Sequence, residues 1–98
     1  MDSRIIINLT DDDKQKSLSM DGKVLFALID RIAKAEEKHP DFADGIYQGV
    51  GVIGEEYGEL CQALNKNQGE ERVMDEALDL LCVVWRFCRG DWEKSRQE

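Results

Sequence analysis

Apolar residues recur along the first half of the chain at helical rather than strand spacing. We predict a first helix from about Gly22 to Lys38, capped by Ser19 or Asp21. His39-Pro40 should end it, because the residue before a proline is driven out of the helical region, and Phe42 should plug the connection that follows. The apolar positions at i, i+3, i+4 and i+7, typical of one buried helical stripe, are Leu25, Leu28, Ile29 and Ile32.

A second helix is predicted from about Asp44 to Asn65, with Gly69 as a terminator after the connecting turn. Its apolar residues alternate steps of three and four, a narrow seam of the kind that two helices share: Val50, Ile53, Tyr57, Leu60 and Leu64. It also carries glycines, which are poor helix formers, at 45, 49, 51, 54 and 58. These glycines indicate either a close approach of another helix or room for a ligand.

A third helix is predicted from about Glu71 to Phe87 or Arg89, stopped by Gly90. Its apolar residues cover much of the circumference: Val73, Ala77, Leu80, Leu81, Val83, Val84, Trp85, Phe87 and Cys88. A helix that is apolar nearly all round is buried on several sides, and in so short a chain this favours a subunit interface.

The two ends of the chain are less regular. Ile5–Leu9 has the composition of a strand without a second strand to pair with, and Asp11–Lys14 is typical of a turn or a solvated start. Residues 1–20 are interpreted as an arm that packs on the bundle or on a partner subunit, or else as a flexible tail. We expect one helical domain at 21–92 and a polar tail at 93–98. The predicted fold is an all-α antiparallel helical bundle completed by oligomerisation.

Composition limits the partners of this domain. A chain of 98 residues, 42% of them hydrophobic, suits one small domain whose core is often enlarged by oligomerisation. Its formal net charge of −8 repels phosphate backbones and anionic lipids, so we expect neither a nucleic-acid polymer nor a membrane as a partner. A small nucleotide that carries its own metal is compatible with this charge.

The three cysteines, Cys61, Cys82 and Cys88, lie within apolar helical patterns and are interpreted as small buried hydrophobic residues in a reducing compartment. The chain has no CxxC pair and a single histidine, which argues against zinc. Neither a signal peptide nor an apolar run of spanning length is evident, so we expect a cytoplasmic protein.

Two acidic segments give the chain its candidate chemistry: Glu55-Glu56-Tyr57-Gly58-Glu59 and Glu76-Ala77-Leu78-Asp79. On a helical wheel, Glu56 and Glu76 each lie about 80° from the centre of the apolar arc of their own helix. Glu59 and Asp79 lie about 60° further round, in the same sense. Two antiparallel neighbours with that offset direct both pairs into one groove.

Four carboxylates in one groove form an oxygen-only site, which suits Mg²⁺ or Mn²⁺. A single acidic pair would usually be a solvated face, but two sets with few lysines at i+4 favour a site. A ferritin-type di-iron centre needs Glu-x-x-His, and both helices lack histidine. Glu55 falls opposite the apolar seam and is expected behind the site or at the surface. Asp75 is interpreted as solvated charge near a helix start.

The paired segments, separated by sixteen residues, resemble the EExxE…ExxD signature of the MazG-like, all-α nucleoside triphosphate pyrophosphohydrolases. The surroundings Ile53–Leu60 and Asp79-Leu80-Leu81 are similar to that family as well, and the similarity extends over about Ile29 to Arg89. It implies Mg²⁺-dependent cleavage of a nucleoside triphosphate between the α- and β-phosphates, releasing the monophosphate and pyrophosphate. It also implies that the site is built in a homodimer or homotetramer.

Carried over by position, the resemblance implies metal ligands at Glu56, Glu59, Glu76 and Asp79, with Glu55 helping to position the attacking water. Lys66 and Arg86 are candidates for phosphate contacts, with solvated surface charge as the alternative. Candidates for stacking on a base, with core packing as the alternative, are Tyr47, Trp85 and Phe42. His39 is interpreted as a loop residue.

Two other interpretations remain open. Phosphoribosyl-ATP pyrophosphohydrolases share the carboxylate pattern, but this chain lacks the lysine expected before Gly54-Glu55-Glu56 and the Tyr-His expected after the second segment. A dUTPase of the same superfamily would usually be longer. A non-catalytic helical module that binds a nucleotide or metal is favoured by the small size and by the lack of an evident cationic cluster.

Overall fold

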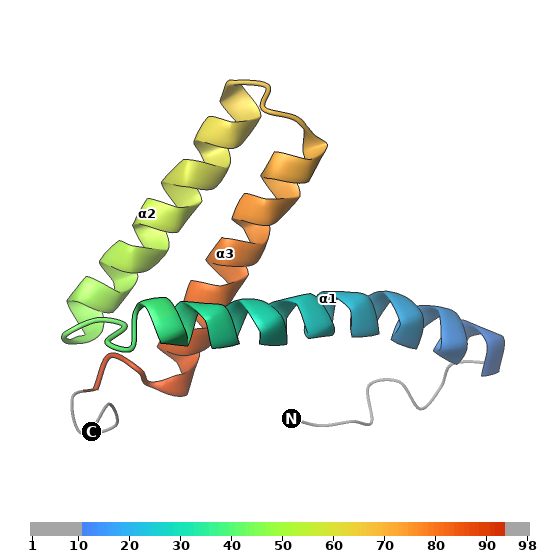
Figure 1. Cartoon of the computed structure of the whole chain (residues 1–98), viewed down its shortest axis with the longest axis horizontal. Helices are drawn as coiled ribbons and strands as arrows, with labels where there is room; N and C mark the ends of the chain where they lie inside the picture. Colours follow the sequence, from blue (N-terminus) through green and yellow to red (C-terminus); the bar gives the residue numbers. More distant parts are fainter. Residues whose placement is uncertain (1–10, 94–98) are drawn as a thin grey trace.

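The structure is a computed structural model that describes the backbone of residues 11–93 and the side chains of residues 19–93. It contains three helices, α1 (Asp11–Lys38), α2 (Ile46–Asn65) and α3 (Glu70–Arg89), and this part of the chain has no strand (Figure 1). The predicted all-α class is confirmed. The strand-like segment Ile5–Leu9 and the tail from residue 94 lie outside the described residues.

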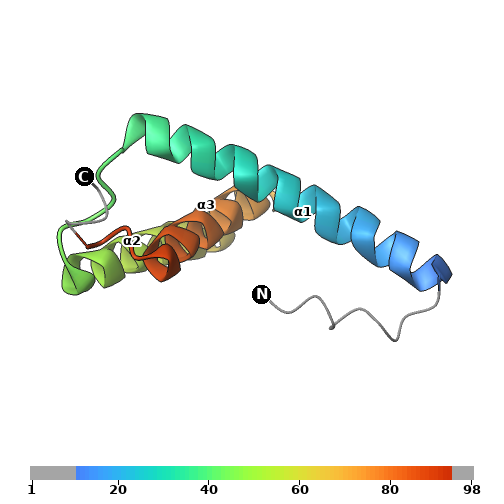
Figure 2. The same cartoon turned by 90° about the horizontal axis from the view of Figure 1, so that it is seen from below.

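α2 and α3 form an antiparallel hairpin, and α1 crosses α3 and extends well past it (Figures 1 and 2). α3 is the central helix, in contact with both others. A small core joins it to α1 through Leu28, Ile32 and Cys82, with Ala35 and Leu78 packed against them. The apolar circumference of α3 therefore reflects in part its place between two helices of the same chain.

α1 begins at Asp11, eleven residues before the predicted start at Gly22. Of the two alternatives for Asp11–Lys14, the turn is therefore wrong, and so is the cap at Ser19 or Asp21. Residues 11–21 contain no glycine or proline and include several good helix formers, so nothing interrupts the helix before Gly22. A single glycine does not end a helix, and a Cβ at Gly22 would meet no neighbour within 4 Å. The end of α1 at Lys38, before His39-Pro40, is confirmed.

α2 begins at Ile46 rather than Asp44, because Gly45 is the N-cap with a φ of 97° that favours glycine. The Gly45 N–H donates to the Trp92 carbonyl (3.0 Å), which ties the start of α2 to the segment after α3. Gly49 is explained instead by the close approach of α3, because a Cβ at this position would lie 2.9 Å from Phe87 Cδ1. At Gly51, Gly54 and Gly58 a Cβ would meet nothing within 4 Å.

The hairpin turn is closed by a different residue from the one predicted. Asn67 takes the left-handed conformation (φ 51°), and the N–H groups of Asn67 and Gln68 donate to Leu64 O (3.2 Å) and Ala63 O (3.1 Å). This is the Schellman pattern at a helix C-terminus. Gly69 caps the start of α3 instead of ending α2. At the other end of α3, Gly90 is left-handed and ends the helix as predicted.

Arg86 fastens the α1–α2 connection to the end of α3. It is 4% exposed, and its guanidinium donates to His39 O (3.0 Å), Pro40 O (3.4 Å) and Asp91 Oδ2 (3.0 Å). Its Cζ also lies 5.2 Å from the centroid of the Phe42 ring, close enough for a cation–π contact. Phe42 is buried, as predicted for a side chain that fills the α1–α2 connection. The alternative that Arg86 is a solvated surface charge is wrong.

Several predicted core positions are exposed in the single chain. Leu28 and Ile32 of the first stripe are buried, but Leu25 and Ile29 are 50% and 58% exposed. The α2 seam is exposed at Val50, Tyr57 and Leu64.

All three cysteines are free thiols, and only Cys82 is buried, so the prediction of burial is wrong for exposed Cys88. Among residues 11–93, no helix combines the length and apolar character needed to cross a bilayer.

Candidate metal centre and adjoining cleft

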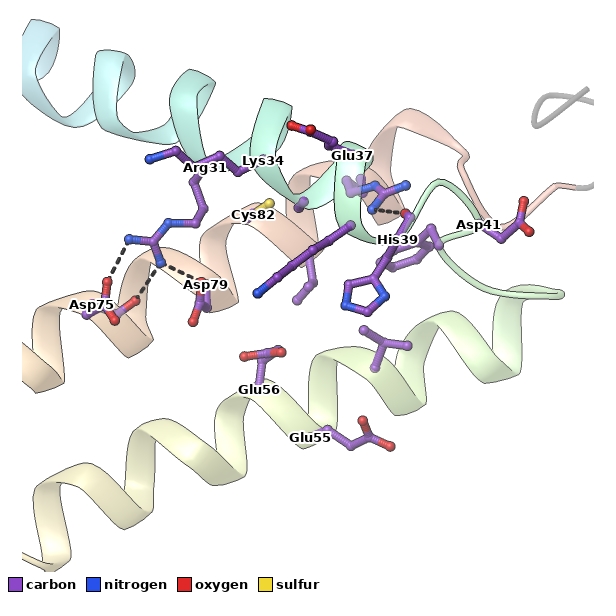
Figure 3. Close-up of a pocket in the computed structure, with 16 residues that line it drawn as sticks. Arg31, Lys34, Glu37, His39, Asp41, Glu55, Glu56, Asp75, Asp79 and Cys82 are labelled. Carbon is purple, nitrogen blue, oxygen red and sulfur yellow. Dashed lines mark hydrogen bonds and ion pairs between the residues drawn. The ribbon is translucent and has the colours of Figure 1, made fainter.

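Three of the four predicted ligands converge between α2 and α3. Glu56 of α2 and Glu76 and Asp79 of α3 each offer a carboxylate oxygen, and these oxygens all lie within 4.8 Å of one another. The antiparallel hairpin brings the i and i+3 positions of α3 opposite Glu56, as the helical wheel predicts. Figure 3 shows Glu56 and Asp79 facing each other across the space between the two helices.

Glu59, the fourth predicted ligand, is exposed and does not belong to this set of oxygens. It follows Glu56 by one turn of α2, and its negative charge raises the pKa values of both Glu56 and Glu76. Glu59 therefore lies at the open edge of the cluster.

Two buried oxygens of the cluster lack a hydrogen-bond partner among the described residues, Glu56 Oε2 and Glu76 Oε2. Burial, together with the charges of Glu59 and Asp79, raises the pKa of Glu56 to about 7. Glu76 is only 2% exposed, and burial raises its pKa as well, against the opposing charge of Arg72. A buried carboxylate oxygen without a donor is unfavourable, and a hard divalent cation satisfies two such oxygens at once. The donor set therefore fits Mg²⁺ or Mn²⁺.

Two arginines that the sequence analysis did not include neutralise part of this charge. Arg72 pairs with Glu76 from one turn earlier in α3 and lies 3.5 Å from Asp75 Oδ2. The i,i+4 spacing of Arg72 and Glu76 is the signal in the sequence that indicates this pair.

Arg31 of α1 reaches across to α3. Its Nη1 lies 2.5 Å from Asp79 Oδ1, and its Nη2 lies 2.6 Å from Asp75 Oδ1 (Figure 3). Nη1 also donates to the Asp75 carbonyl (3.2 Å). Asp75 is therefore an ion-pair partner, and its interpretation as solvated charge is wrong. Asp79 shares its carboxylate between the acidic cluster and this guanidinium.

The cluster opens into a cleft of about 1010 Å³ between the three helices. The acidic side chains on its α2 and α3 walls are Glu55, Glu56, Asp75 and Asp79. Its α1 side carries Arg31, Lys34, Lys38 and, just after the helix, His39. A set of cations, which was not evident in the sequence, thus lines the cleft from one helix, opposite the acidic walls on α2 and α3. Pockets of about 300–1,000 Å³ are typical of small-ligand sites.

The remaining candidates separate by their position relative to the cleft. Glu55 lines it as an exposed side chain that points away from Asp79 (Figure 3), in line with a place outside the ligand set. Arg86 and Phe42 line it as well, although the Arg86 guanidinium already has three acceptors. His39 follows α1 in the connection, as predicted. The exposed candidates Lys66, Tyr47 and Trp85 do not line the cleft.

Comparison with protein-family models, curated proteins and solved structures finds no match to this chain. The geometry of the site and the resemblance of its two acidic segments therefore carry the functional argument.

Proposed function

We propose that this protein is a Mg²⁺-dependent nucleoside triphosphate pyrophosphohydrolase of the MazG-like type. The observation that carries the proposal is that Glu56 and Glu76 each have a buried carboxylate oxygen without a hydrogen-bond partner among the described residues. Both belong to a group of three acids, with Asp79, that each offer a carboxylate oxygen within 4.8 Å of the others. Arg72 and Arg31 offset part of the charge of Glu76 and Asp79, but the two unpartnered oxygens have no donor from the described residues. The EExxE…ExxD spacing and the adjoining cleft of mixed charge support the same proposal.

In the proposed reaction, water attacks the α-phosphorus and the bond to the bridging oxygen of the β-phosphate breaks. A nucleoside monophosphate and pyrophosphate are released, so the products contain the atoms of one triphosphate and one water. Glu56, Glu76 and Asp79 would hold Mg²⁺, which neutralises phosphate charge and polarises the reacting groups when bound. Glu59, at the open edge, is available as a further ligand. Glu55 lines the cleft and would help to position the attacking water.

We further propose that the site works in a homodimer or homotetramer. The exposed stripe of α2 contains Val50, Tyr57 and Leu64 beside Gly51, Gly54 and Gly58, at which a Cβ would meet no neighbour. Small residues beside exposed apolar ones suit the close approach of another helix, and a second copy would remove them from water.

The test is a screen for pyrophosphate release across canonical and modified nucleoside triphosphates, with Mg²⁺, with Mn²⁺ and with EDTA. We expect turnover of at least one triphosphate only with the metals. Glu56→Gln and Asp79→Asn should lower kcat by at least about 100-fold while the protein stays folded. The matched control is Glu71→Gln, which removes an exposed charge at the start of α3. Turnover in EDTA, or unchanged rates in both site variants, would refute the proposal.

A non-catalytic nucleotide- or metal-binding module is the second candidate, and one observation favours it. Arg31 and Arg72 already pair with Asp79 and Glu76, so the cluster is partly neutralised without a metal. This candidate predicts that no triphosphate is turned over, and that Glu56→Gln raises stability by relieving carboxylate repulsion. Relief of carboxylate repulsion is expected of both candidates, so the turnover screen is the measurement that separates them.

A further inference from the structure

The last two turns of α1 place three cations on one helical face. Arg31, Lys34 and Lys38 follow the spacing i, i+3 and i+7, and all three line the cleft. Glu37 and Asp41 also line it, but Figure 3 shows their carboxylates pointing away from Glu56 and Asp79. The cleft therefore has an acidic floor on α2 and α3 and a cationic wall on α1.

The cations of this wall differ in how firmly they are engaged. Arg31 is held by two carboxylates, Asp75 and Asp79. Lys34 Nζ lies 2.9 Å from Asp30 Oδ2, but this pair is 71% and 57% exposed, and surface pairs of this kind contribute little. Within the described residues, no ion pair involves Lys38. The two lysines are thus available to a ligand, whereas Arg31 holds α1 over the floor.

Such a division of charge suits one kind of ligand. A bare cation needs only the floor, and a bare anion at the lysines would meet the repulsion of the four acids below. A phosphate chain that carries a divalent cation places its positive ion against the carboxylates and its outer oxygens toward the ammonium groups. A lysine acts here as a point charge on a flexible stem, which tolerates different phosphate positions.

We propose that Lys38 and Lys34 of α1 bind the phosphate chain of the ligand whose metal is held by Glu56, Glu76 and Asp79. This inference rests on the proposed function only in taking the floor as a metal site, and it assigns the substrate-contacting cations to α1 instead of to Lys66 or Arg86. Lys38 carries the larger share, because Lys34 must first leave Asp30.

The experiment measures binding of inorganic pyrophosphate, a product that the proposed reaction does not cleave, by calorimetry in the presence of Mg²⁺. We expect Lys38→Gln to weaken binding about tenfold and Lys34→Gln about threefold, as loss of charge-assisted hydrogen bonds predicts. Lys23→Gln removes the same charge from an exposed position of α1 outside the cleft, and we expect a change of less than about twofold. Binding of Mn²⁺ alone, followed by its paramagnetic resonance signal, should not weaken in any of the three variants.

The outcomes separate this inference from the proposed function. Pyrophosphate bound by the parent and weakened by Lys38→Gln supports the inference, even if no triphosphate is turned over. Triphosphate turnover with equal pyrophosphate affinity in parent, Lys38→Gln and Lys34→Gln overturns the inference and leaves the proposed function standing. Absence of pyrophosphate binding by the parent, or an equal loss in Lys23→Gln, also overturns it.

Discussion

Arg86 and Arg31 both tie the first half of the chain to α3, but they do so in different surroundings. Arg86 is buried, has two backbone carbonyls and Asp91 as acceptors, and lies against the Phe42 ring. The Arg31 side chain is 26% exposed and has two carboxylates as partners, one of which belongs to the candidate metal centre. Backbone carbonyls cannot leave for another ligand, whereas a carboxylate can exchange a guanidinium for a metal ion. The contacts of Arg86 are therefore permanent, whereas the Arg31–Asp79 ion pair can be exchanged for a metal ion at Asp79.

The largest expected effect comes from breaking the permanent contact. Arg86→Met keeps much of the apolar side chain but leaves Asp91 and two carbonyls without this donor, so we expect a loss of about 3 kcal/mol in the free energy of unfolding. Urea unfolding followed by circular dichroism measures it. A loss below about 1 kcal/mol would mean that water replaces the guanidinium and that Arg86 is not a fastening.

Breaking the exchangeable contact should have a smaller effect that depends on metal. Arg31→Met leaves Asp75 and Asp79 unneutralised, so we expect a loss of about 1–2 kcal/mol in EDTA, with a larger rise in Tm on adding Mg²⁺ than in the parent. Thermal scans with and without Mg²⁺ provide both values. If the Mg²⁺-induced rise is smaller in the variant, Arg31 orients Asp79 for the metal and does not compete with it.

Arg31 pairs with Asp79 but not with Glu56, and the pH dependence of stability tests the uncompensated charge of Glu56. Its pKa of about 7 in the folded protein lies above the ordinary value of 4.5, so the folded state binds its proton more tightly than the unfolded state. The stability contribution of this group is fully present below pH 4.5 and is lost as the pH rises through about 7. In EDTA, Glu56→Gln should therefore gain stability relative to the parent across this window, by about 1 kcal/mol or less after allowance for solvent screening.

Urea unfolding at pH 4.5, 6 and 8 gives this profile. Glu55→Gln, which removes an exposed charge beside it, is the matched control and should change stability by less than about 0.5 kcal/mol. A difference between Glu56→Gln and the parent that is flat with pH would contradict the electrostatic origin of the effect.

The smallest effect is expected at Arg89, the neighbour of Arg86 in the same ion-pair cluster. It pairs with Glu36 (2.7 Å) and Asp91 (2.5 Å) but is 42% exposed. Arg89→Gln should lower stability by about 0.5–1 kcal/mol, and less in 1 M NaCl because exposed charges are screened. A loss as large as that of Arg86→Met would show that charge, rather than burial, distinguishes the two arginines.

The features that the sequence predicted correctly depend on local spacing. The end of α1 before His39-Pro40 and the stop at Gly90 follow from backbone restrictions of single residues. The convergence of Glu56, Glu76 and Asp79 follows from helical periodicity together with one antiparallel hairpin. In each case a short segment contains the information needed.

The features that it missed depend on how α1 crosses the hairpin. Arg31 and Asp79 are 48 residues apart, and no periodicity indicates which residue of α1 lies over which residue of α3. The same crossing gathers Lys34 and Lys38 over the carboxylates. The apolar stripe of α1 predicts burial at all four positions, but α3 covers only Leu28 and Ile32, and Leu25 and Ile29 stay half-exposed in the single chain.

The two tryptophans lie in different places, and this gives the protein an intrinsic optical reporter. Trp92 donates its indole N–H to Phe87 O (3.1 Å), and its ring is tilted by 34° to the Phe87 ring with 6.2 Å between the centroids. This contact lies at the end where α3 meets the start of α2. Trp85 is 41% exposed on α3. Association that covers α3 would shift the emission of Trp85 to shorter wavelength, whereas opening of the hairpin end would release Trp92 to water and shift its emission to longer wavelength. A Trp85→Phe variant would leave fluorescence to report on folding alone.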